Sequence, residues 1–110
     1  MDAKKQRRLE AAGWRVGSAA DLLELTPEES ALIDLKLSLG RLVRRTRQRA
    51  NLSQHSLADR LHSSQSRVAK LEAGDTSVSL DLIVKATFAA GAKRADVANA
   101  IRKKKRVVSR

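Results

Sequence analysis

The stretch from Leu52 to Gly74 constrains the fold of this chain more than any other segment. It holds two helical patterns in close succession, each preceded by a serine, and it ends in a glycine. A serine before a helix can accept a hydrogen bond from a backbone N–H of the first turn, and glycine readily takes the left-handed conformation that ends a helix. These signals predict one helix over 54–61 after Ser53 and a second over 65–73 after Ser64.

Two helices joined by so short a turn form a helix-turn-helix when their apolar faces meet. Each helix has an apolar stripe at helical spacing, made of Leu57, Ala58 and Leu61 on the first and of Val68 and Leu71 on the second. The polar side of the second helix consists of Gln65, Ser66, Arg67 and Lys70. Such side chains can read base edges or hold phosphates. The same pattern also fits an ordinary antiparallel helix pair with a solvated polar face.

The net charge favours nucleic-acid binding over that ordinary pair. The 110 residues carry a formal net charge of +11, which suits an anionic partner such as nucleic acid, a membrane surface or an acidic protein. Over half of the excess lies in residues 100–110, which hold six basic and no acidic side chains. We expect this end of the chain to add affinity for phosphates without choosing among sequences.

Composition also disfavours several classes of protein. The chain has no cysteine and only two histidines, so we expect no disulfide, no metal site and no cofactor. No apolar run approaches the roughly 20 residues of a membrane span and no signal peptide is visible, which predicts a cytoplasmic protein without a membrane partner. One Trp, one Phe and no Tyr argue against an aromatic platform for single strands. No catalytic constellation appears, so we expect no enzyme.

A long helix precedes the central pair. Thr26, Pro27 and Glu29 form a helix start with a capping box, and the helical pattern continues to about Arg49. Its two apolar stripes consist of Leu32, Leu35, Leu39, Leu42 and Val43, and of Ile33, Leu37 and Gly40. A helix with two apolar faces packs on two neighbours. One is the central pair, and the other is either residues 14–25 or a second subunit.

Two more helices follow the central pair. Ser79 predicts a helix over 80–90 that stops at Gly91. Its apolar side consists of Leu80, Ile83, Val84, Thr87 and Phe88. A last helix is expected over 95–104, with Val97, Ala98 and Ile101 turned inward.

The predicted fold class is therefore all-α, in three parts. Residues 1–25 form a short helical N-terminal arm, residues 26–101 form a five-helix domain, and residues 102–110 form a basic tail. The arm contains Trp14 and an apolar segment with Leu22, Leu23 and Leu25. Trp14 either packs into the core under the domain or anchors the chain on a protein partner. The second reading follows from the preference for Trp at interface hot spots.

Three segments carry a more specific pattern: L-S-Q-H-S-L-A, then S-Q-S-R-V-A-K-L-E-A-G, then S-L-D-L-I-V-K-A. Through them the chain from Leu39 to Ile101 resembles the Cro/phage-repressor (Xre-type) family of helix-turn-helix proteins. The resemblance implies a lambda-repressor-like DNA-binding domain in a transcriptional regulator that is usually dimeric. The N-terminal segment G-W-R-V-G-S-A-A-D-L-L-E-L-T-P-E-E looks like the leader of small repressors encoded as antitoxins in toxin–antitoxin pairs.

The resemblance also implies which residues bind DNA. The helix over 65–73, which begins at Ser64, would lie in the major groove and present its N-terminal half to the bases. Gln65 would pair with adenine, Lys70 would reach guanine, and Ser66 can bond to either. Arg67 would project sideways toward a phosphate.

Other positions are implied to hold the DNA backbone or the domain itself. Gln54 matches a phosphate-clamping glutamine, with local capping as the alternative. Ser77 and Ser79 lie where the family makes further backbone contacts, although capping explains them equally well. Arg47 and Glu72 match an ion pair that ties the long helix to the recognition helix, so Arg47 is expected to be structural.

Several positions depart from the family pattern, among them Thr46, which replaces a usual large aliphatic residue and leaves a smaller core contact. Asn51 stands where the family often has Gly, and His62-Ser63 stands where it often has Gly-Val. Asn tolerates the left-handed conformation, whereas His tolerates it less easily.

Three functions are compatible with these residues. The first is a sequence-specific DNA-binding transcriptional regulator that represses its own operon and binds duplex DNA as a homodimer. The second is an antitoxin that neutralises a toxin protein through its N-terminal arm, alone or in addition to DNA binding. The third is a non-specific nucleoid or RNA-binding protein that relies on charge. The polar side of the helix over 65–73 favours the first.

Overall fold

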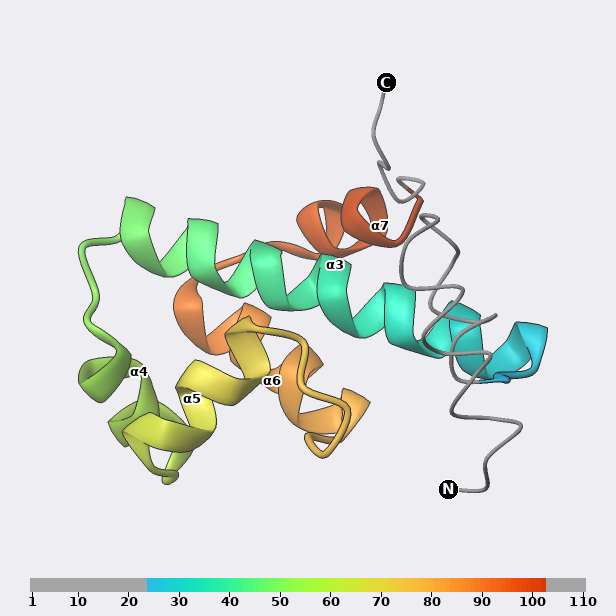
Figure 1. Cartoon of the computed structure of the whole chain (residues 1–110). Coiled ribbons are helices and arrows are strands. Elements are labelled where there is room, and N and C mark those ends of the chain that lie inside the picture. Colours follow the sequence, from blue (N-terminus) through green and yellow to red (C-terminus); the bar gives the residue numbers. More distant parts are fainter. Residues whose placement is uncertain (1–23, 103–110) are drawn as a thin grey trace, which may run out of the picture. The chain divides into compact units, whose positions relative to one another are not determined.

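The computed structural model describes residues 24–102, which contain five helices and no strand. In chain order these are α3 (Pro27–Arg49), α4 (Gln54–Leu61), α5 (Gln65–Glu72), α6 (Leu80–Ala90) and α7 (Arg94–Arg102) (Figure 1). The prediction of a five-helix, all-α domain is thereby confirmed. The expected arm around Trp14 and the basic tail beyond residue 102 lie outside the described residues.

The chain divides within α3, between Leu32 and Ile33, into two compact units. The described part of the first unit holds the start of α3. There Glu29 N–H donates to Thr26 Oγ1 over 3.1 Å, and Thr26 N–H donates to Glu29 Oε1 over 2.9 Å. The predicted capping box is therefore formed, with Pro27 as the first helical residue.

In the second unit the predicted serine caps start three helices. The side chains of Ser53, Ser64 and Ser79 each accept a hydrogen bond from the N–H three residues further on. The donor–acceptor distances are 2.9, 3.1 and 3.2 Å for the N–H groups of Ser56, Arg67 and Leu82. These local bonds satisfy backbone donors that have no partner inside the helix.

Four helices end in the same way. The first or second residue after each of these helices has a left-handed backbone conformation. Its φ is 58° at Asn51, 53° at His62, 72° at Gly74 and 111° at Gly91. The N–H of the next residue then bonds to the carbonyl oxygen five positions back, at 2.9–3.0 Å: Leu52 to Arg47, Ser63 to Ala58, Asp75 to Lys70 and Ala92 to Thr87. His62 thus adopts the conformation that histidine tolerates poorly. Helix α5 ends at Glu72, one residue before the predicted end.

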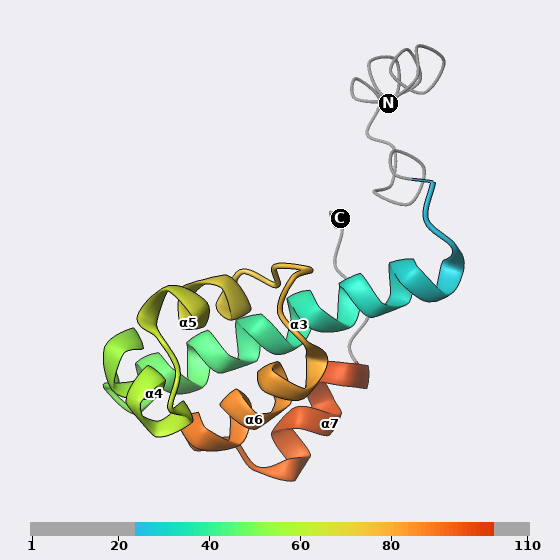
Figure 2. The ribbon, with the colours of Figure 1, turned by 90° about the horizontal axis from the view of Figure 1, so that it is seen from below.

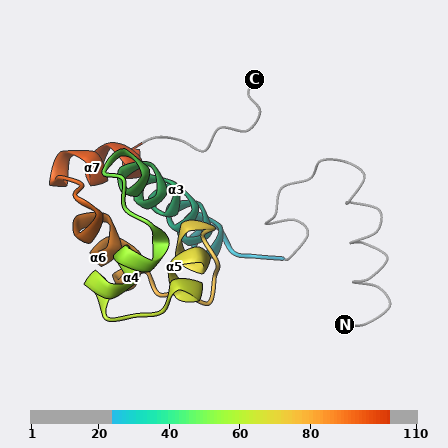
Figure 3. The same ribbon diagram turned by 90° about the vertical axis from the view of Figure 1, so that its left-hand side faces the viewer.

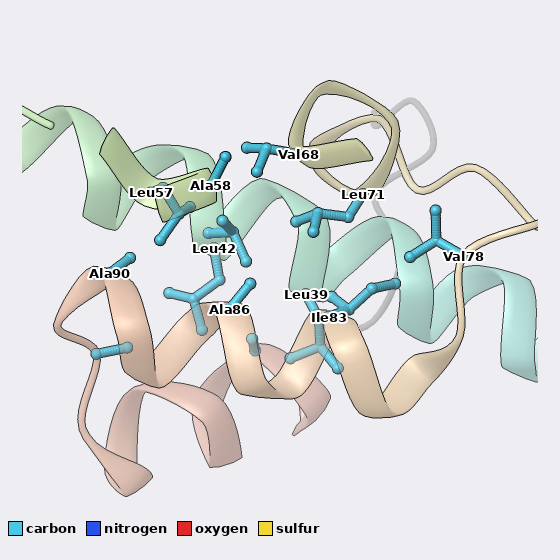
Figure 4. Packing of buried hydrophobic residues seen from close by; sticks show 13 residues of the cluster. Leu39, Leu42, Leu57, Ala58, Val68, Leu71, Val78, Ile83, Ala86 and Ala90 are labelled. Atoms are coloured by element: carbon cyan, nitrogen blue, oxygen red, sulfur yellow. The ribbon is translucent and has the colours of Figure 1, made fainter. Parts of the chain in front are cut away.

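The core of the second unit draws on five helices, and α7 contributes Ala100 to it. Its buried apolar residues are Leu39, Leu42 and Val43 from α3, Leu57 and Ala58 from α4, Val68 and Leu71 from α5, and Ile83, Ala86 and Ala90 from α6 (Figure 4). Val78 joins them from the loop between α5 and α6. Burying one such Leu, Ile or Val contributes roughly 1.5–3 kcal/mol, so this cluster holds α4 and α5 in place.

Helix α6 links the central pair to the last helix. It packs against α4 and α5, and α7 packs against α6 on the side away from α5 (Figure 2). Figure 3 shows α4 and α5 adjacent to each other and below α3. The outer face of α5 is therefore not covered by another described helix.

Gly40 allows α3 and α5 to touch through their backbones. A Cβ added there would lie 3.0 Å from the carbonyl oxygen of Glu72 and closer still to that of Leu71. Leu37 packs in the same way on Gly74, where a Cβ would be 2.7 Å from Leu37 Cδ2. Leu37 and Gly40, two residues of the second apolar stripe of α3, thus pack against α5 and the residue Gly74 that follows it.

Three side chains expected to face inward are exposed. Phe88 on α6 is 45% exposed and Ile101 on α7 is 52% exposed, and Ala98 is exposed as well. Helix α7 turns Ala100 to the core instead and leaves Val97 half-buried. The small side chain of Ala100 lets α7 approach α6 closely, which the larger Ile101 would prevent. Helix α7 begins at Arg94, where Lys93 N–H donates to Asp96 Oδ2 over 2.9 Å.

Candidate nucleic-acid interface

The outer face of α5 carries every polar residue that the sequence assigned to it. Ser64, Gln65, Ser66, Arg67 and Lys70 are all exposed. On the opposite side of the same helix Val68 and Leu71 are fully buried. The apolar side chains thus fix the rotation of α5 about its axis, and the polar ones are left to solvent or to a ligand.

The start of α5 and the following loop surround a shallow hollow of about 260 Å³. Its lining consists of Ser64, Ser66, Arg67, Lys70, Ser77 and Val78. Neither Arg67 nor Lys70 forms an ion pair with a residue of the described chain. Three hydroxyl groups and two cations that are in no ion pair with a described residue surround one hollow, and these are donors that proteins use to hold phosphate oxygens.

The loop that brings Ser77 to this hollow is tied to α3. The Nζ of Lys36, a buried side chain, donates to the carbonyl oxygen of Thr76 over 3.0 Å. Asp75 Oδ1 accepts from Ser77 N–H over 2.8 Å. Hydrogen bonds from the Ser77 side chain and backbone lower the pKa of the Asp75 carboxyl. The sequence pattern does not single out Lys36, because a lysine inside a basic helix looks like a surface residue.

Ser79 and Gln54 already have partners within the domain. Ser79 is exposed and caps α6. Gln54 is half-buried, and its Nε2 donates to Glu72 Oε1 over 3.1 Å. Its Oε1 accepts from Gln65 Nε2 over 3.4 Å. The sequence contained one indication of this last contact, since both glutamines directly follow the serine cap of their helices.

The structure brings Arg47 and Glu72 together. Arg47 Nε donates to Glu72 Oε2 over 2.5 Å, Nη2 donates to Oε1 over 3.1 Å, and Nη1 donates to the carbonyl oxygen of Leu52 over 2.9 Å. The two side chains are 12% and 5% exposed. The hydrogen bonds that Arg47 donates to Glu72 raise the pKa of the Arg47 guanidinium. This pair joins α3 to the end of α5.

A second surface feature lies on α6 and α7. Phe88 and Ile101 are exposed there beside half-buried Val97, and with Arg94, Ala95 and Ala98 they line an open hollow of about 870 Å³. Large exposed apolar side chains gathered in one place are typical of contact surfaces. The expectation from the sequence that Phe88 and Ile101 face inward is therefore wrong.

Within residues 24–102 no cluster of three or more His, Cys, Asp or Glu side chains is placed to bind a metal ion. No helix of this part of the chain is sufficiently long and apolar to cross a membrane.

Comparison with known proteins gives one match. Residues 38–100, which run from α3 into α7, match a family model described as a helix-turn-helix domain. No curated protein and no solved structure matches the chain.

Proposed function

Because the chain belongs to the helix-turn-helix domain family, we propose that it is a sequence-specific transcriptional regulator that reads the major groove of duplex DNA with α5. The observation that carries this proposal is the exposed polar face of α5, which holds base-reading and phosphate-holding side chains on one rigid helix. The resemblance of the chain to phage repressors supports repression as the mode of regulation, including repression of its own operon.

Each exposed side chain of α5 has a proposed role. Gln65 and Ser66 stand in the first turn and contact base edges, and Lys70, one turn further, reaches guanine. Arg67 and Ser77 line the hollow beside α5 and hold a backbone phosphate there. Phosphate contacts position the protein on the duplex, and base contacts provide the choice of sequence.

The N-terminus of α4 supplies a second phosphate contact in this proposal. N–H groups in the first turn of a helix lack partners inside it, and the helix dipole favours an anion there. Ser53 accepts from the N–H of Ser56, which leaves those of Gln54 and His55 free to face a phosphate. The side chain of Gln54 has one N–H beyond its bond to Glu72 that can join them.

Two substitutions on α5 test the assignment of roles. Gln65→Ala should weaken binding to the preferred site by about 1–3 kcal/mol and relax the choice at one base pair, with the salt dependence unchanged. Arg67→Ala should weaken binding to all sequences alike and lower the log–log salt slope by about 0.9, which is one phosphate. Titration of both variants against the site and a one-base-pair variant, at several salt concentrations, measures this. A change of base preference in Arg67→Ala alone would refute the assignment.

We also propose that the regulator is a homodimer joined through the apolar surface of Phe88, Val97 and Ile101. Repressors of this kind bind two half-sites one helical turn apart, about 34 Å, so each needs a partner copy. The exposed Phe88 and Ile101 support this proposal, because a two-fold axis brings the same patch of both copies together. Sedimentation should show a dimer for the chain and a monomer for Ile101→Ser. A monomeric wild-type chain that protects a single unrepeated site would contradict this.

The alternative of an antitoxin rests on the N-terminal arm, whose Trp14, Leu22 and Leu23 lie outside the described residues. No described feature favours it, so regulation of transcription is the function proposed.

A further inference from the structure

A row of three arginines on α3 takes no part in the contacts described above. Arg41, Arg45 and Arg49 stand four residues apart, so they share one face of the helix, and they are called the arginine row below. All three are exposed, and none forms an ion pair with another described residue. From Leu35 to its end, α3 has no acidic side chain. The row therefore carries positive charge that α3 itself does not balance.

The arginine row faces away from α4 and α5. Residues two positions apart on a helix point about 200° apart, because each residue turns the helix by about 100°. The first two members of the row come two positions after Leu39 and Val43, which are buried in the core. The third comes two positions after Arg47, which donates to Glu72 on α5. Because α4 and α5 lie together below α3 in Figure 3, the row points to the other side of α3.

Neither the helix dipole nor solubility accounts for this row. The dipole favours cations at a helix C-terminus, but its effect falls off within the last turn. Arg41 stands about two turns before the end of α3. A surface that only keeps a protein soluble mixes charges of both signs, whereas this face has one sign. The row therefore fits a binding surface for an anionic partner.

The surroundings of the row favour phosphate groups over an acidic protein. Among residues 38–49 no large apolar side chain is exposed. The centre of an interface between proteins contains apolar and aromatic side chains, whereas phosphate contacts need only charge and N–H donors. A guanidinium can donate two parallel hydrogen bonds to one phosphate. The row is about 12 Å long at 1.5 Å per residue, which matches three or four steps of one DNA strand at about 3.4 Å each.

A duplex bound to α5 does not reach this row, because α3 lies between them. Gly40 brings the backbones of α3 and α5 into contact. Packed helices have axes about 8–10 Å apart and diameters of about 10–12 Å, so roughly 20 Å separates the row from the outer face of α5. A straight duplex that touches one of these faces leaves the other open.

We infer that the arginine row binds the phosphates of a second segment of duplex DNA, so that the chain bridges two segments. The inference takes from the proposed function that α5 holds the first segment. A distant part of the same DNA molecule is then present at a high effective concentration, so even a weak contact is occupied. The second contact selects no sequence, because it involves only the backbone.

Capture of a second duplex by a protein–DNA complex tests this inference. A duplex recovered by site selection from a randomised library is immobilised, saturated with the full chain and washed. A labelled duplex of shuffled sequence is then added at several salt concentrations. The wild-type complex should retain the labelled duplex at low salt. In the triple variant Arg41→Gln, Arg45→Gln, Arg49→Gln the log–log salt slope of this retention should fall by about 2.7, which is three phosphates, with binding to the immobilised duplex unchanged.

The matched control is the triple variant Arg41→Lys, Arg45→Lys, Arg49→Lys, which keeps the charge at the same positions. It should keep the wild-type salt slope, because the slope counts neutralised phosphates. Thermal melts show that both variants are folded. Two competitors, polyglutamate and an RNA duplex of the same length, are added to the wild-type complex. Unlabelled DNA duplex should displace the labelled duplex at a lower concentration than either of them.

Each outcome decides the inference separately from the proposed function. A wild-type complex that retains no labelled duplex overturns the inference, as does a folded Gln variant with the wild-type slope. If polyglutamate or the RNA duplex displaces the label at the lowest concentration, the row belongs to that class of partner and the inference is wrong. A chain that binds the selected and shuffled duplexes equally overturns the proposed function. Capture between two shuffled duplexes then still decides whether the row holds a second segment.

Discussion

Replacement of Glu72 by alanine should destabilise the domain strongly, because it removes one partner of a buried ion pair. The carboxylate accepts from Arg47 Nε and Nη2 and from Gln54 Nε2. In Glu72→Ala all three donors lose their acceptor, and Arg47 retains only the carbonyl oxygen of Leu52. A positive charge would then remain at a site where its side chain is 12% exposed.

The cost follows from this burial. Breaking a buried pair by removing one partner costs about 3–5 kcal/mol, and we expect the lower half of this range because some water reaches Arg47. Small domains are stable by about 5–15 kcal/mol in total. At about 4–8 °C per kcal/mol for a domain of this size, the melting temperature should fall by at least about 12 °C.

Thermal melts followed by circular dichroism measure this effect. Asp59→Ala is the matched control, since Asp59 is 73% exposed and lies 3.6 Å from His55, and an exposed pair contributes at most about 1 kcal/mol. The double variant Arg47→Met with Glu72→Met should recover much of the loss, because it removes the unpaired charge along with its partner. A Glu72→Ala melt within about 3 °C of the control would refute the reasoning.

Three further changes have defined outcomes. Gly40→Ala should cost about 1–3 kcal/mol or more in a thermal melt, because the new methyl group meets the backbone carbonyl of Leu71; full stability would contradict the close approach. His62→Gly should raise stability toward denaturant by up to about 1 kcal/mol, since relief of the left-handed conformation at φ 53° exceeds the entropy cost of glycine; a loss of stability would count against it. In Ser77→Ala the pKa of Asp75 should rise toward its ordinary value in an NMR titration, because a donor has gone. The Asp75 contribution to stability is present above its unfolded pKa and is lost as pH falls through the lowered folded pKa. In the variant this contribution should therefore be smaller, and its loss should be complete at a higher pH.

The elements that could be predicted from sequence are those that depend on near neighbours. Ser53 and Ser79 bond to N–H groups three residues away, so the helices over 54–61 and 80–90 have the predicted bounds. The left-handed residues at Gly74 and Gly91 are equally local. His62 is different, because a residue other than glycine takes the left-handed conformation at this helix end.

The features that could not be predicted depend on how helices cross. Whether α7 buries Ile101 or Ala100 is decided by the shape of α6, and the spacing of apolar residues permits either. The bond from Gln54 to Glu72 joins residues eighteen positions apart, and only the close contact of α3, α4 and α5 brings them within reach. The polar face of α5 was predicted, whereas its link to the ion pair was not.

The central claim is that α5 selects a DNA sequence, and the ratio of two dissociation constants tests it most directly. Fluorescence anisotropy of the full chain would compare the duplex recovered by site selection with a shuffled duplex of the same composition, at several salt concentrations. Specific recognition predicts a ratio of at least about 10³ near physiological salt. A ratio near one at every salt concentration, with affinity that falls only as salt rises, would show that the charge of the chain alone binds DNA and would contradict the account.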